Sequence, residues 1–117
     1  MAILMKALCE LDKFKTLIIK HNIIGRKSIE ELIPMMHRSG NASLNELRLV
    51  DCKTQPEAVD ELLKQMKDSN GMLKKLGFVQ MNLQDYHMFS LVPFLEKAKF
   101  LVELDLSWNK LMPKQML

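Results

Sequence analysis

Side chains that could catalyse a reaction or bind a metal ion are few in this sequence and widely spaced. His21, His37 and His87 have no His, Cys or carboxylate neighbours at the spacing of a zinc site, and all three are expected at the surface. Cys9 and Cys52 lie too far apart to indicate a metal motif, and two cysteines do not make a disulfide framework. The sequence therefore predicts no metal ion, and both cysteines are interpreted as structural.

Phosphate-binding and acid-base motifs are missing as well. The four glycines form neither G-x-x-x-x-G-K nor G-x-G-x-x-G, the sequences whose backbone amides bind phosphates. Glu30 and Glu31 are consecutive, so on a helix their side chains diverge and suit a solvated first turn better than paired acid and base. We expect a protein that is not an enzyme and that carries no cofactor.

Composition indicates one folded domain. Of 117 residues, 48% are hydrophobic and 26% are charged, which excludes a disordered chain. The net charge of +3 is small and dispersed, and the lysines of EAVDELLKQMKD alternate with acids without interleaved aromatics, which argues against nucleic acid. Charges interrupt every apolar stretch, so no membrane association is expected, and the N-terminus lacks the features of a secretory signal.

Three segments share one apolar pattern at a spacing of 28 or 29 residues: LNELRLVDCKT from Leu44, LKKLGFVQMNL from Leu73 and LVELDLSWNKL from Leu101. A fourth, FKTLIIKHNII, starts 30 residues upstream at Phe14. With the first residue of each as position 1, positions 1, 4, 6 and 11 are apolar everywhere except at Thr54. Such consistency indicates an internal repeat.

Each unit is predicted to contain a short strand followed by a helix. Positions 4 and 6 lie two residues apart, on one face of a strand, and later apolar residues at spacings of 3, 1 and 3 form one helical stripe. The sequences at Ser28 and at Pro56 are typical of helix starts, whereas Pro34 and Pro93 indicate helices that begin late or are kinked. The predicted helical core comprises Ile29, Leu32, Ile33, Met36, Val59, Leu62, Leu63, Met66, Met88, Leu91, Val92 and Leu95.

The pattern resembles that of the leucine-rich repeat family, whose unit reads L-x-x-L-x-L-x-x-N/C-x-L. The long period and the cysteine in one unit are similar to the ribonuclease-inhibitor-like class. The resemblance implies an α/β solenoid of about 3.5 repeats, with short parallel strands on the concave face and helices on the convex face. At position 9 the family places an Asn or Cys that hydrogen-bonds neighbouring turns; Asn22, Cys52 and Asn109 match, and Met81 predicts a locally weaker ladder.

The predicted boundaries divide one repeat array. Residues 1–13 form the helix of an incomplete first repeat, 14–43, 44–72 and 73–100 are full repeats, and 101–117 form an incomplete last repeat. A solenoid needs terminal units with a polar outer face, and neither end offers one. We therefore expect either a segment of a longer protein or ends covered by further repeats or subunits.

Strand side chains that point away from the core are expected to form the binding surface. Ile18, Val50, Val79 and Trp108 form an apolar seam among polar residues, and aromatic and arginine side chains are typical anchors of protein interfaces. For Trp108 a second interpretation stays open, in which the indole packs over the next loop. The predicted partner-binding residues are Arg48, Val50, Asp51, Val79, Gln80, Asp105 and Trp108.

These observations favour a non-catalytic interaction module or scaffold that binds a protein partner, of unknown identity, on its concave strand face. One alternative is a structural subunit of a large assembly such as an axoneme. Another, implied by the resemblance, is a regulatory leucine-rich repeat protein that acts on a small GTPase or serves as a substrate receptor of a ubiquitin ligase. The expected location is cytoplasmic; the phrase LDLSWNKL resembles ciliary members and points to a cytoskeletal or ciliary site as the narrower possibility.

Overall fold

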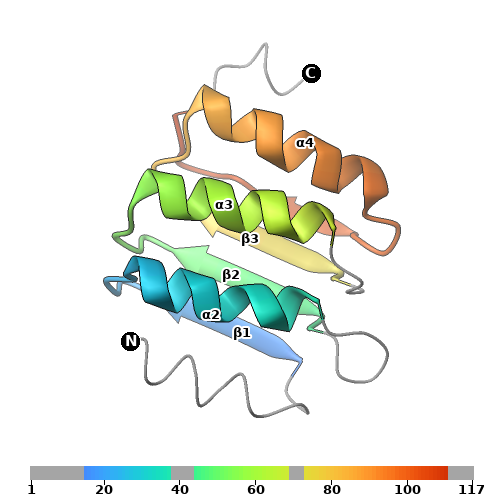
Figure 1. Ribbon diagram of the computed structural model, residues 1–117, viewed down its shortest axis with the longest axis horizontal. Helices are drawn as coiled ribbons and strands as arrows, with labels where there is room; N and C mark the ends of the chain where they lie inside the picture. Colours follow the sequence, from blue (N-terminus) through green and yellow to red (C-terminus); the bar gives the residue numbers. More distant parts are fainter. Residues whose placement is uncertain (1–14, 38–43, 69–72, 111–117) are drawn as a thin grey trace.

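The computed structural model describes residues 15–37, 44–68 and 73–110. Within them, strands alternate with helices in the order β1 (Thr16–Lys20), α2 (Arg26–Met36), β2 (Glu46–Val50), α3 (Pro56–Lys67), β3 (Lys75–Val79), the short 3₁₀ turn η2 (Asp85–His87), α4 (Met88–Lys97) and β4 (Glu103–Asp105). The strands pair in chain order into one parallel four-stranded sheet. Helices α2, α3 and α4 lie side by side over one face of this sheet (Figure 1). The α/β class with parallel strands is thereby confirmed.

Strand pairing follows the alignment of the sequence pattern. Leu47 of β2 pairs with Leu17 of β1 and Leu76 of β3, and Leu76 in turn pairs with Leu104 of β4. The row beside it, on the opposite face, contains Ile18, Arg48, Gly77 and Asp105. Residues that share a position in the pattern therefore lie side by side across the sheet.

The hydrophobic core lies between the sheet and the helices. Alternation along β1 and β2 turns one set of side chains inward, and Leu47 and Leu49 are fully buried. Helix α3 places Leu62 and Leu63 against them, also without exposed surface. Burial of each such side chain stabilises the folded chain by about 1.5–3 kcal/mol, so this layer contributes a large part of the stability of the fold. Met66 and Met88 are buried as predicted, and Met81 is buried as well.

The helices start and end partly as predicted. Helix α3 begins at Pro56, where the missing N–H costs no hydrogen bond. Helix α2 instead begins at Arg26 after Gly25, so the expected helix start at Ser28 is wrong and Ser28 lies buried inside the helix. Pro34 lies inside α2, which is not shortened at its start, whereas α4 begins late, at Met88, and contains Pro93.

Two residues predicted as core are exposed, and four more, Ile33, Leu95, Leu101 and Leu106, are half-buried at its margin. Val92 on α4 is 38% exposed and Leu104 on β4 is 37% exposed, because both belong to elements at the edge of the sheet and have a packed neighbour on one side only. Periodicity assigned them to the core by analogy with interior units. The predicted helix at 1–13, together with Phe14, Cys9 and Leu111, lies outside the described residues.

Candidate functional site

The sheet face opposite the helices holds most of the predicted partner-binding residues. Arg48 and Val50 lie on β2, Val79 on β3 and Asp105 on β4, so three adjacent strands contribute to this open face. The other three predicted residues, Asp51, Gln80 and Trp108, follow the carboxyl ends of β2, β3 and β4. Val50 and Val79 pair with each other and are half-buried, whereas Ile18 on β1 pairs with Arg48, so the predicted apolar seam is not continuous.

Arg48 is the centre of a charged network on the open face. Its Nε donates to Glu46 on the same strand, and its Nη2 donates to Glu103 two strands away. The side chain crosses Gly77 of β3, where an added Cβ would lie 3.2 Å from Nη1 and 3.3 Å from Cγ of Arg48. Glycine at position 77 therefore gives the guanidinium a low path across the sheet.

Asp105 borders the same network at the edge strand. The hydroxyl of Ser107 donates to Oδ1 of Asp105, and the backbone N–H of Ser107 donates to the same oxygen at 3.0 Å. These hydrogen bonds, with the charge of Arg48, hold the pKa of the Asp105 carboxyl below its ordinary value, although desolvation acts in the opposite direction. Asp105 is thus kept as a carboxylate beside the guanidinium.

A column of left-handed backbone runs along the carboxyl ends of the strands. Position 8 of the sequence pattern has a positive φ in every unit, from 49° at Asp51 to 61° at Trp108. This conformation is costly for residues with a Cβ, and most of all for bulky ones. The N–H of each inner residue of the column bonds the next strand, as from Asp51 to Val79 O at 2.8 Å and from Gln80 to Ser107 O at 3.0 Å.

Trp108 projects from the last position of this column. It is 83% exposed, so the interpretation in which the indole packs over a neighbouring loop finds no support in the described residues. A left-handed tryptophan that is almost wholly in solvent combines backbone strain with an uncovered aromatic surface. Strained residues of this kind persist where the surroundings hold them, and they cluster at recognition sites.

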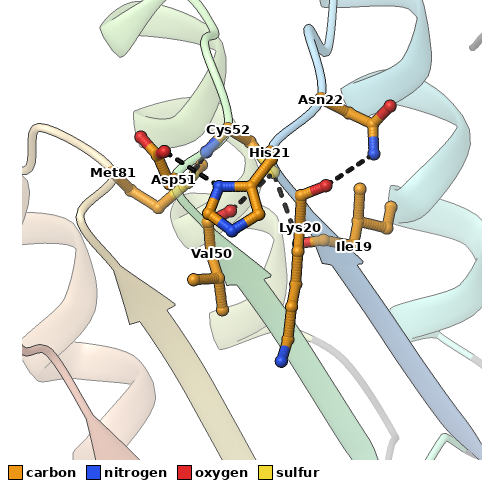
Figure 2. Close-up of polar contacts among 8 residues, drawn as sticks. All are labelled: Ile19, Lys20, His21, Asn22, Val50, Asp51, Cys52 and Met81. Carbon is orange, nitrogen blue, oxygen red and sulfur yellow. Dashed lines mark hydrogen bonds and ion pairs between the residues drawn. The ribbon is translucent and has the colours of Figure 1, made fainter.

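His21 and Asp51 form a pair at the other end of the column. Nδ1 of His21 lies 2.9 Å from Oδ2 of Asp51, and both side chains reach solvent (Figure 2). An open hollow of about 280 Å³ borders them and is lined by His21, Asn22, Ile23, Asp51 and Lys53. The thiol of Cys52, next to Asp51 in the chain, is buried and directed to the carbonyls of Ile19 and Val50.

Position 9 of the pattern links neighbouring turns where its side chain permits. Asn109 Oδ1 accepts from the N–H groups of Met81 and Leu83, and its Nδ2 donates to Phe78 O at 2.6 Å. Cys52 Sγ makes the equivalent contact with Ile19 O at 3.3 Å (Figure 2).

The contact of Met81 is weaker, as predicted. Its sulfur accepts one hydrogen bond, from Cys52 N at 3.4 Å (Figure 2). A thioether has no proton to donate, so it cannot reproduce the bond that Asn109 Nδ2 makes to a carbonyl of the preceding turn.

His87 is not a surface residue, contrary to the sequence-based expectation. It is buried, with Nδ1 accepting from Gln84 N at 2.9 Å and Nε2 donating to Pro56 O at 3.0 Å. It thereby fastens the turn before α4 to the first turn of α3. The η2 turn directs His87 into the core, and the apolar periodicity of the sequence did not predict this turn.

Sequence reasoning also missed exposed aromatic residues on the helical side. Phe89 is 80% exposed at the start of α4, and Tyr86 precedes it in η2. Burial raises the pKa of the Tyr86 hydroxyl, and the charges of Glu57 and Asp60 act in the same direction. Both residues lie on the helical side of the molecule, so they are not part of the predicted binding surface.

Comparisons with known proteins identify no relative. Searches against protein-family models, curated proteins and solved structures found no match to this chain. Within the described ranges, His, Cys, Asp and Glu side chains do not gather in groups of three or more that could hold a metal ion. The helices in those ranges are also too short or too polar to cross a bilayer.

Proposed function

We propose that this chain is a leucine-rich repeat protein of the ribonuclease-inhibitor-like class that binds a protein partner on its open sheet face and catalyses no reaction. Recurring backbone contacts support the solenoid part of this proposal. The carbonyl before each of β1, β2 and β3 accepts two N–H groups from the start of the next strand, as Asn45 O does from Lys74 and Lys75. Equivalent contacts at equivalent positions are typical of stacked repeats.

The exposed, left-handed Trp108 is the observation that carries the binding proposal. It borders an open face that combines the half-buried valines Val50 and Val79 with the arginine network. Interfaces concentrate their binding energy in aromatic and arginine side chains surrounded by residues that exclude water. The Arg48 side chain is already oriented by Glu46 and Glu103, so little conformational entropy is lost when a partner docks.

Site-specific crosslinking tests the location of the partner. A photoreactive phenylalanine analogue placed at Trp108, or at Val79 in the middle of the face, is expected to crosslink the partner in cells. The same analogue at Phe89, which is equally exposed on the helical side, serves as the matched control. Crosslinks of equal yield from Phe89 would contradict the assignment of the binding face.

A double substitution tests how much Trp108 and Arg48 contribute to the affinity for the partner. Trp108→Ala with Arg48→Ala is expected to weaken capture of the crosslinked partner at least tenfold while the circular dichroism spectrum stays unchanged, since neither side chain belongs to the core. Unchanged capture by the folded double variant would remove the open face from consideration.

A scaffold role in a larger assembly is the second candidate, and the exposed apolar residues at the β4 edge favour it. Phe100, Val102 and Leu104 lie exposed there, and such patches mark surfaces that other polypeptide covers. We propose that further repeats or subunits pack against the ends of the sheet. The cytoplasmic location stays a prediction.

A further inference from the structure

The edge of β4 leaves open two backbone contacts that the preceding strands make. The carbonyl before each of β1, β2 and β3 accepts two N–H groups from the start of the next strand, as Asn45 O does. The N–H after each of these three strands donates to the next unit, as Asp51 N–H does to Val79 O. The equivalent groups of the last strand are Val102 O and the N–H of Trp108. Among the described residues neither has a partner, so β4 presents an unfilled hydrogen-bonding template.

Apolar side chains flank this template. Leu104 is 37% exposed, whereas its counterpart Leu17, on the edge strand at the other side of the sheet, is 9% exposed. Val102, just before β4, is 78% exposed. A further strand beside β4 would cover these side chains, and each covered methylene group would contribute about 0.8 kcal/mol.

The turn after β1, at the other edge of the sheet, has a hydrogen-bond acceptor and an apolar side chain that a β4 edge could contact. Asn22 occupies the position of Asn109, but its Oδ1 has no partner among the described residues, whereas Asn109 Oδ1 accepts two N–H groups of the preceding turn. Ile23 follows it and is 75% exposed, at a position where the other units have Lys53, Asn82 and Lys110. Both edges therefore carry an uncovered apolar residue, Ile23 on one and Trp108 on the other, beside unused hydrogen-bonding groups.

The charges of the edge strands favour pairing of β4 with β1 of a second chain over pairing of two β4 strands. If two β4 edges paired with each other antiparallel, Glu103 and Asp105 of one chain would face those of the other, and like charges opposite one another destabilise a sheet. If β4 paired in parallel with β1 of a second chain, the pattern would place Lys20 beside Ser107 and diagonal to Asp105. Strand direction is also preserved in this arrangement, because the sheet is parallel throughout.

We propose that the β4 edge of one chain binds the β1 edge of a second copy, head to tail, so that the sheet continues across the contact. Trp108 then lies beside His21 of the next chain, as Asp51 lies beside His21 within one chain. A heterologous contact of this kind does not close, and it produces oligomers of increasing length. The inference rests on the proposed packing of further units at the ends. It shares Trp108 with the proposed partner site, whereas Val79 on β3 belongs to the open face alone.

Complementation between two edge variants tests this contact. Ile23→Asp alters only the β1 edge and Trp108→Asp only the β4 edge. By sedimentation velocity, the wild-type chain is expected to gain mass beyond a dimer with rising concentration, whereas each variant alone stays monomeric. An equimolar mixture of the two variants retains one intact edge of each kind, so it is expected to form heterodimers and nothing larger. Phe89→Asp, on the helical side, is the control and should associate like the wild type.

Each contrary result has a definite meaning. A wild-type chain that stays monomeric, while the photoreactive analogue at Val79 still crosslinks to a different protein, would overturn this inference and leave the proposed function standing. Association that Ile23→Asp does not weaken would indicate pairing between like edges and would also overturn it. A mixture without heterodimers, when both variants keep the wild-type circular dichroism spectrum, would exclude the head-to-tail contact.

Discussion

The guanidinium of Arg48 crosses the backbone of Gly77 to reach Glu103, two strands away. This contact ties three strands of the open face together through side chains in addition to the backbone ladder. Because Gly77 has no Cβ, the arginine lies low on the sheet, and its charge stays fixed between Glu46 and Glu103. The orientation of the Arg48 guanidinium thus depends on Gly77, which leaves room for it over β3.

Gly77→Val is expected to displace Arg48 without unfolding the sheet. A Cβ at position 77 would lie 3.2 Å from Nη1 and 3.3 Å from Cγ of Arg48, so the whole arginine side chain must rotate away from β3. Valine suits a strand better than glycine, so the free energy of unfolding should change by less than about 1 kcal/mol. The Nε–H resonance of Arg48 should lose its hydrogen-bonded shift, and partner capture should fall. Lys75→Ala on the same strand, as the control, should leave that resonance in place.

Thr54→Val is expected to stabilise the protein. Oγ1 of Thr54 is buried without a hydrogen-bond partner, at the single position where the apolar pattern of the sequence is broken. A buried unsatisfied hydroxyl costs about 1–3 kcal/mol, and valine has nearly the same shape. Urea denaturation should show a higher midpoint with an unchanged slope. Thr54→Ser keeps the hydroxyl and removes the methyl group, so a midpoint at or above that of the wild type for this variant would contradict the explanation.

Asn109→Leu should destabilise the protein far more than Asn22→Leu. Asn109 accepts from Met81 N and Leu83 N and donates to Phe78 O, so its loss leaves several partly buried backbone groups unpaired. The expected cost is about 2–4 kcal/mol. Among the described residues, the side chain of Asn22, at the equivalent position, bonds only Lys20 O two residues away. Equal losses for the two variants in thermal unfolding would show that the ladder contacts of Asn109 contribute little.

The pH dependence of stability should include a contribution from Asp105. Its pKa is lower in the folded chain than its ordinary value, so the folded state favours the carboxylate. The resulting stabilisation is complete above the unfolded pKa of about 3.9 and is lost as the pH falls through the folded value. Asp105→Asn should flatten the acid limb of the stability curve in this window.

The hydroxyl of Ser107 is the largest cause of that shift. Ser107→Ala should therefore raise the pKa of Asp105 toward its ordinary value, as measured by carbon-detected NMR titration of the carboxyl group. Ser90→Ala, whose hydroxyl bonds Asp60 on the helical side, should leave the titration of Asp105 unchanged. An unshifted curve for Ser107→Ala would assign the effect to the backbone N–H or to Arg48.

The strand pairing could be predicted from the sequence because burial imposes it. A one-residue slip of β2 against β3 would move Leu47 and Leu49 into solvent, so repeated leucines specify the pairing as well as the strands. Exposure at the edges could not be predicted in the same way. Val92 and Leu104 follow the same pattern as buried residues, and whether they are covered depends on which neighbours are present.

The left-handed column had only a weak sequence signal, and the histidine contact had none. His and Asp are enriched at positive φ, as at His21 and Asp51, but Gln80 and Trp108 carry no such preference. His87 is buried because a short 3₁₀ turn rotates it toward Pro56, and apolar periodicity does not detect such a turn. Tertiary contacts, rather than local preference, decide both features.

In the left-handed column, the backbone makes the contacts that continue the strand ladder, and the side chains do not. At Asp51 and Gln80 the N–H group holds the next strand, so the strand pairing there does not depend on which side chain is attached. Adjacent positions repeat at the strand spacing of about 4.8 Å, with the side chains at the rim of the sheet. Side chains of this row can be exchanged one at a time for others that tolerate a positive φ, so the row is a natural place to introduce new binding specificities on an unchanged scaffold.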